Sequence, residues 1–139
     1  MEISDPFVAY KSTDDGNILS LIEMIRNGIK FPAFSFLAAK SPFSLSEWSS
    51  FLHISDRTMQ RYKKESLTFD PLQSEKIVEI ALLFNKGNEV FGTTDKFNLW
   101  LESDNLALGM LKPKNLLDSS FGINLLKDEL DRIENGVLA

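Results

Sequence analysis

Apolar residues recur at the three- and four-residue spacing of α-helices along most of the chain from residue 17 onward. In the first such stretch the apolar positions are Ile18, Leu21, Ile22 and Ile25. The stretch stops at Asn27-Gly28, a pair that commonly ends a helix. Convincing alternation of apolar and polar residues, which would indicate strands, does not appear, and neither does an internal repeat. The pattern therefore predicts an all-α fold.

Capping and helix-breaking residues divide the rest of the chain into further helices. Pro32 suits the first turn of a second helix, and Asp70-Pro71 begins a long one that we expect to end before Gly87. The residues of this long helix expected to face inward are Leu72, Ile77, Ile80, Ala81 and Phe84. Thr93 or Thr94 caps a short helix, Pro113 opens a brief turn of helix, and a final amphipathic helix follows.

The most specific local pattern lies between residues 44 and 62. Ser44 and Glu47 form the S-x-x-E capping box that begins a helix, and Ser55 can cap a second helix after a short turn at His53. Two helices joined by so short a turn are typical of a helix-turn-helix motif. His53 stands where glycine is common, and histidine tolerates the positive φ of such a turn. The buried seam between the two helices is expected to contain Trp48, Leu52, Ile54, Met59 and Tyr62.

The second helix of this motif carries side chains suited to DNA. In a helix-turn-helix its early turns enter the major groove, where Arg and Gln pair with base edges and Lys, Ser and Thr suit phosphates. We expect DNA contacts from Ser55, Arg57, Thr58, Gln60, Arg61, Lys63 and Lys64. The alternative is that two amphipathic helices of a bundle simply expose a solvated basic face.

The distribution of charge supports DNA binding more than its total does. The formal net charge of −5 argues against a nucleic-acid binder, but the charge is segregated. Residues 40–69 carry five basic and three acidic side chains, whereas residues 70–139 carry seven basic and twelve acidic ones. The net-basic segment coincides with the predicted motif. Because the local potential, and not the total charge, steers a polyanion to a surface, this coincidence favours DNA binding.

Composition narrows the remaining functions. The chain of 139 residues has no cysteine, which excludes disulfides, thiolate nucleophiles and Cys-containing zinc sites. Its only histidine, His53, lacks an activated serine or carboxylate companions at a spacing suited to catalysis or metal binding. A Gly-rich phosphate loop is also missing. We expect no enzyme, no metal and no cofactor.

Membrane and export segments are not apparent either. No run approaches the roughly 18 apolar residues of a membrane span. The first ten residues have neither the basic nor the apolar region of a secretory signal. We therefore expect a cytoplasmic protein that does not contact a membrane.

The second half carries six ordered sequence elements. They are Val90-Phe91-Gly92, Lys96-Phe-Asn-Leu-Trp100-Leu101, Asn105-Leu-Ala-Leu-Gly109, Lys112-Pro113-x-x-Leu116-Leu117, Phe121-Gly122, and Leu130-x-x-Ile133-x-x-Gly136-Val137. Together they resemble the Xre/MbcA/ParS antitoxin family, and the resemblance covers about residues 30–139. The departures from the family pattern are modest. Asp104-Asn105-Leu106 lacks the proline often seen there, and Met110 replaces a second small residue after Gly109.

The resemblance implies a helix-turn-helix followed by a small helical toxin-binding domain. Such proteins resemble the antidote halves of type II toxin–antitoxin operons, usually paired with RES-domain toxins that consume NAD. By this resemblance the C-terminal helix and tail occlude the toxin's active site, while the helix-turn-helix represses the shared operon. We expect a RES-domain toxin and operator DNA as partners, and a homodimer. The expected toxin contacts are Leu126, Glu129, Leu130, Arg132, Ile133, Asn135, Gly136 and Val137.

These observations predict three segments. They are a flexible N-terminal arm over 1–16, a helix-turn-helix DNA-binding domain over 17–69 and a toxin-binding domain over 70–139. Two alternatives stay open at this point. The protein could be a helix-turn-helix transcriptional regulator without a toxin partner, and the apolar stripe on the last helix could close the protein's own bundle or a homodimer.

Overall fold

The structure, a computed structural model, describes residues 15–136. Its helices are α1 (Asp15–Asn27), α2 (Phe31–Lys40), α3 (Leu45–Leu52), α4 (Asp56–Glu65), α5 (Pro71–Phe91), α6 (Thr94–Glu102) and α7 (Ser120–Glu134), with 3-10 turns η1 (Leu106–Leu108) and η2 (Pro113–Leu116). Within the described residues, β pairing is limited to the isolated bridges Lys30–Thr68 and Asn105–Leu111. The all-α prediction is confirmed.

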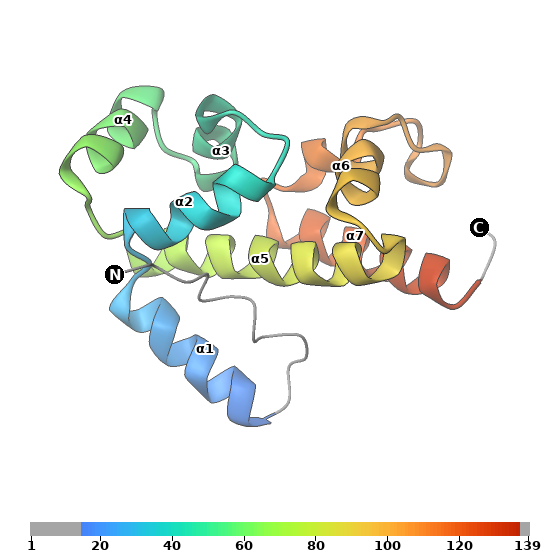
Figure 1. The fold of residues 1–139 in the computed structure, drawn as a ribbon, viewed down its shortest axis with the longest axis horizontal. Coiled ribbons are helices and arrows are strands. Elements are labelled where there is room, and N and C mark those ends of the chain that lie inside the picture. Colours follow the sequence, from blue (N-terminus) through green and yellow to red (C-terminus); the bar gives the residue numbers. More distant parts are fainter. Residues whose placement is uncertain (1–14, 137–139) are drawn as a thin grey trace.

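Helix α5 is the central element of the fold. Figure 1 shows it running along the length of the molecule, and α1, α3, α6 and α7 all pack against it. It begins with a second capping box, in which the Asp70 carboxylate accepts the Gln73 N–H at 2.7 Å. Ile77, Ile80 and Leu83 are fully buried along its length. Because α5 has apolar side chains on several faces, it packs against several helices at once.

The end of α5 differs from the prediction. The helix does not stop before Gly87 but continues to Phe91 and is capped by Gly92, whose φ is 84°. A Cβ at Gly87 would lie only 2.3 Å from ring atoms of Phe97 on α6. Gly87 therefore allows α5 and α6 to approach closely, which explains a glycine inside a helix.

One aromatic core spans the molecule. Phe34 and Trp48 meet edge to face with ring centroids 5.1 Å apart in the N-terminal half. In the C-terminal half Phe84 and Phe97 do the same at 5.2 Å. Phe43 joins the two groups, with its ring centroid 6.1 Å from that of Phe84. The two halves of the chain thus share a continuous core.

Some apolar residues of the helical pattern lie at the surface, including Leu72, which is expected from the sequence to face inward. Ile18 and Ile22 of α1 are 38% and 37% exposed, because α1 extends away from the other helices and packs on α5 through one side only. Leu72, in the first turn of α5, is 80% exposed. Helical spacing identified the helices correctly, but it overestimated how much of each helix its neighbours cover.

The predicted flexible arm over 1–16 lies outside the described residues except for its last two positions, which already belong to α1. Among the helices that the structure describes, none has the length and apolar character that crossing a bilayer requires.

Candidate functional sites

The turn between α3 and α4 has the geometry that the sequence predicts. The Ser44 hydroxyl accepts the Glu47 N–H at 3.1 Å, and the Glu47 carboxylate accepts the Ser44 N–H at 3.2 Å. Helix α3 ends at His53, whose φ of 58° and ψ of 41° are left-handed. Ser55 then caps α4 by accepting the Thr58 N–H at 3.0 Å. The capping box, the short turn and the positive φ at His53 are all confirmed.

The predicted seam fixes α4 against α3. Trp48 and Met59 are fully buried and Leu52 is 4% exposed, while Ile54 and Tyr62 are half-buried. The Trp48 indole N–H donates to the Ser41 hydroxyl at 3.0 Å, so the buried ring keeps its polar atom satisfied. The seam holds one face of α4 inside and leaves the opposite face in water.

That outer face carries most of the residues expected to contact DNA. The exposed members are Ser55, Arg57, Gln60, Arg61, Lys63 and Lys64. Thr58 is half-buried, and its Oγ1 accepts a hydrogen bond from the Ser55 hydroxyl at 2.9 Å. Ser55 and Thr58 therefore hold the start of α4 together.

Among the described residues, the cations of α4 are not paired with acidic side chains. Within the described part of the chain, Arg57, Lys63 and Lys64 form no ion pair, and the Arg61 guanidinium lies 5.7 Å from the centroid of the Tyr62 ring. Asp56, an acidic residue of this helix, accepts a hydrogen bond from the Ser46 hydroxyl at 3.2 Å. This face can neutralise phosphates without first breaking an ion pair to another described residue.

The structure divides the residues expected to contact a toxin into two groups. Leu126 and Leu130 are fully buried and Glu129 is 5% exposed, because they lie on the face of α7 turned toward the core. These three side chains hold α7 in its own bundle and offer no surface to a partner. The exposed group consists of Arg132, Ile133, Asn135 and Gly136. Val137 lies outside the described residues.

Ion pairs fasten the exposed end of α7 to the body of the protein. Within α7 itself, the Glu129 carboxylate accepts from the Arg132 guanidinium at 2.8 Å, and the contacts to the body come from α5. Lys86 of α5 pairs with Asp131 at 2.5 Å and approaches Glu134 at 3.8 Å. The hydrogen bond with Asp131 is the main reason that the pKa of Lys86 is raised. The last turn of α7 is thus held in place up to its end.

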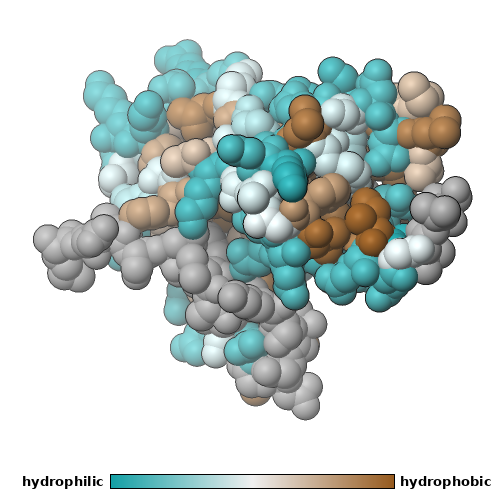
Figure 2. Space-filling view, turned by 45° about the vertical axis from the view of Figure 1, so that its right-hand side comes forward, coloured by the Kyte–Doolittle hydropathy of each residue, from teal (hydrophilic) through white to brown (hydrophobic). Residues whose placement is uncertain are grey.

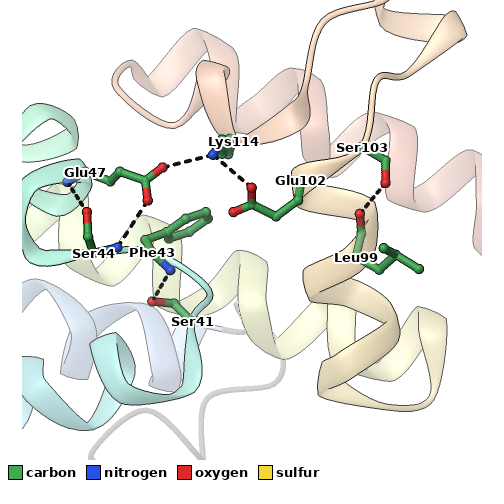
Figure 3. A network of polar contacts seen from close by, with 8 residues as sticks. All are labelled: Ser41, Phe43, Ser44, Glu47, Leu99, Glu102, Ser103 and Lys114. Atoms are coloured by element: carbon green, nitrogen blue, oxygen red, sulfur yellow. Dashed lines mark hydrogen bonds and ion pairs between the residues drawn. The ribbon is translucent and has the colours of Figure 1, made fainter.

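A second set of ion pairs connects the two halves of the chain. Figure 3 shows Lys114 of η2 between Glu47 of α3 and Glu102 of α6, with Nζ 3.1 Å and 2.8 Å from their carboxylate oxygens. The hydrogen bonds with Glu102 and Glu47 raise the pKa of Lys114. Burial acts to raise the pKa of Glu47, but the Ser44 backbone and Lys114 outweigh it, so this pKa is lowered. Both Glu47 and Lys114 therefore favour their charged forms in the fold.

Two further hydrogen bonds cross the same junction. His53 Nε2 lies 2.8 Å from the backbone carbonyl oxygen of Asp118, just before α7 begins. The Asn98 side-chain amide donates to the carbonyl of Lys40 at 3.2 Å. Sequence reasoning missed these two bonds and the bridge from Lys114 to Glu47. The two residues of each contact lie 58 to 67 positions apart in the sequence, so no local sequence pattern predicts that they meet.

The described residues contain no group of acidic or histidine side chains suited to holding a metal ion. A pocket of about 390 Å³ lies beside His53, between α3 and the start of α5. Three of its polar side chains bond to one another, since the Ser120 hydroxyl donates to Glu79 at 2.9 Å and Lys76 lies 3.3 Å from the Ser120 hydroxyl. These groups form a structural network at the start of α7.

Two family models match the chain in order. The antitoxin Xre-like helix-turn-helix domain matches residues 20–82, and the antitoxin Xre/MbcA/ParS C-terminal toxin-binding domain matches residues 86–136. The junction between the two matches falls within α5. The central helix therefore contributes to both domains.

A solved structure shares this fold. A chain of the crystal structure of the M. tuberculosis MbcT–MbcA toxin–antitoxin complex aligns with a TM-score of 0.58 and 19% sequence identity, over 76% of this chain and 94% of that chain. No curated protein sequence matches the chain. Because both domain models match in order and together span residues 20–136 almost completely, the protein belongs to the Xre/MbcA/ParS antitoxin family, with a helix-turn-helix domain followed by a toxin-binding domain.

Proposed function

We propose that this antitoxin binds operator DNA through the outer face of α4. The observation that carries this proposal is the exposed row of arginines and lysines on that face, which form no ion pairs with the rest of the described chain. Arg57, Gln60 and Arg61 read base edges, while Lys63 and Lys64 bind phosphates. Ser55 and Thr58 keep the start of the helix in shape and contact the backbone of the DNA. The protein binds its operator as a homodimer, since a dimeric helix-turn-helix protein matches the two half-sites of a palindromic operator.

We further propose that the end of α7 and the tail neutralise a cognate toxin of the RES type, which consumes NAD. Arg132, Ile133, Asn135 and Gly136 are exposed at the end of a helix that ion pairs hold in place. An apolar side chain among polar groups at a rigid helix end suits insertion into a concave site. With Val137 these residues occlude the active site of the toxin, whereas the buried Leu126, Glu129 and Leu130 take no part. The protein acts as a stoichiometric inhibitor and not as an enzyme, and it needs no cofactor.

A crossed pair of variants tests both halves of the proposal. Arg57→Ala with Arg61→Ala is expected to weaken binding to DNA from upstream of the gene by about 1–3 kcal/mol for each base-reading side chain removed. This double variant still rescues growth when it is co-expressed with the toxin of its operon. Deletion of residues 135–139 gives the reverse result, because operator binding persists and rescue is lost. Gel shifts at several salt concentrations and growth assays measure the two effects.

A matched charge control completes the design. Arg26→Ala with Lys30→Ala removes the same charge from two exposed positions outside α4 and leaves both functions intact. Circular dichroism checks that every variant keeps its helices. An unchanged gel shift for the α4 variant would exclude DNA binding by this helix. Full rescue by the truncated chain would exclude tail occlusion, and operator binding without any rescue by the wild type would indicate a regulator that has no toxin partner.

A further inference from the structure

A concentrated apolar surface lies outside both proposed sites, in the segment 105–111 between α6 and η2. In this segment, here called the anchor loop, Leu106 is 83% exposed, Met110 57% and Leu111 49%. Figure 2 shows it as a hydrophobic patch at the right-hand edge of the molecule. Clustered apolar side chains exposed on a small protein commonly mark an interaction site.

The backbone of the anchor loop holds these side chains in place. The Met110 N–H donates to the Asn105 carbonyl at 2.8 Å, and the Asn105 N–H donates to the Leu111 carbonyl at 3.0 Å. Leu108 packs against the core and fastens the loop from beneath. Met110 has a φ of 68°, a left-handed conformation that a residue with a side chain keeps only where its surroundings impose it. The loop therefore presents its apolar tip in a fixed shape.

The position of the anchor loop points to a protein partner rather than to DNA. The loop lies within residues 86–136, the segment matched by the toxin-binding domain model. Figure 1 shows the loop after α6 at the same end of the molecule as the end of α7, and α4 at the opposite end. A protein that docks on the exposed end of α7 reaches the anchor loop as well.

We propose that Leu106, Met110 and Leu111 form a docking anchor for the same toxin, separate from the tail that blocks its active site. The inference rests on the proposed function and divides it into two roles. The anchor loop supplies affinity, because apolar side chains that are already rigid lose little entropy on binding and pack into an apolar depression of the partner. The end of α7 supplies inhibition, because it enters the cleft.

Separate measurements of affinity and inhibition test this division of roles. The full-length variant Leu106→Ser with Met110→Ser is expected to raise the Kd for the purified operon toxin at least about tenfold in biolayer interferometry. At saturating antitoxin this variant still inhibits the toxin completely. Deletion of residues 135–139 has the opposite effect, since the toxin is bound but stays active. The matched control is Leu72→Ser, which replaces a side chain that is 80% exposed at the start of α5 and leaves both measurements unchanged.

The outcomes separate the anchor from the proposed function. An unchanged Kd for the anchor-loop variant, together with loss of inhibition by the truncated chain, overturns the anchor alone. A smaller mass of the free variant in sedimentation, with unchanged toxin affinity, assigns the patch to a second copy of this chain and also overturns it. Failure of the wild-type protein to bind or inhibit the toxin overturns both proposals.

Discussion

His53 shows how much one residue decides in this fold. Its left-handed backbone ends α3 and directs the chain into α4, while its ring reaches the Asp118 carbonyl beside the start of α7. The first role follows from the sequence, because a residue that tolerates positive φ stands at the position of a tight turn. The second depends on a partner 65 residues away. The residue thus serves both the helix-turn-helix and its attachment to the toxin-binding domain.

Substitutions at His53 separate these two roles. His53→Gly relieves the left-handed backbone but removes the bond to Asp118, so we expect a small net change in the free energy of unfolding. His53→Val removes the same bond and places a β-branched residue at φ 58°, so it is destabilised by about 1–2 kcal/mol more than His53→Gly. Urea denaturation of the two variants measures the difference. Equal midpoints would show that the backbone at residue 53 carries no strain.

At the scale of helices, the local sequence predicts where a helix begins better than it predicts which neighbouring helices bury its faces. The caps of α3, α4 and α5 depend on residues within one turn, and the sequence identifies all three. The sequence pattern places Gly87 beyond the end of a helix. The structural reason for a glycine there is the Phe97 ring, which belongs to the next helix and which no local pattern reveals. The apolar stripe of α7 shows the same limit. Periodicity finds Leu126, Leu130 and Ile133 together, but only the fold shows that the core covers the first two and leaves Ile133 at the surface.

The bridge at Lys114 connects three elements, and its stability contribution depends on pH. Lys114→Met breaks both ion pairs, which at partly exposed sites contribute about 0.2–1 kcal/mol each. The pKa of Glu47 is lowered from 4.5, so its share is present above that value and is lost as the pH falls through the lower folded pKa. The pKa of Lys114 is raised from 10.5, so its share is complete below that value and is lost as the pH rises through the higher folded pKa.

The cost of Lys114→Met is therefore expected to be constant between about pH 5 and pH 10 and to shrink on either side. Urea denaturation of the variant and the wild type across this range gives the profile. Lys127→Met is a suitable control, because within the described residues Lys127 has no ion pair. Its removal is therefore expected to cost no stability that varies with pH. A cost that does not change with pH would show that Lys114 acts through packing alone.

At the scale of the molecule, two proposed functions share one core. The outer face of α4 and the exposed end of α7 lie at opposite ends of α5, so a bound toxin and a bound operator need not compete for surface (Figure 1). The predicted boundary between residues 69 and 70 follows the change of charge along the chain. The two family-model matches, over residues 20–82 and 86–136, meet within α5. The charge of a segment describes its surface, whereas a domain is defined by the helices that pack into one core. A boundary drawn from charge alone therefore does not reveal that both halves share α5.

The shared helix leads to a prediction about fragments. Residues 1–69 alone are expected to be unfolded, because they lack the face of α5 that covers Phe43 and lack Ser74, whose hydroxyl accepts the buried Ile29 N–H at 2.8 Å. A buried donor left without a partner costs about 1–3 kcal/mol, and so short a chain has little core to offset it. Residues 1–92 keep α5 and are expected to unfold cooperatively on heating and to bind operator DNA. Circular dichroism melts and gel shifts of both fragments test this. Cooperative folding of residues 1–69 would show that the helix-turn-helix is an independent domain and that α5 belongs only to the toxin-binding half.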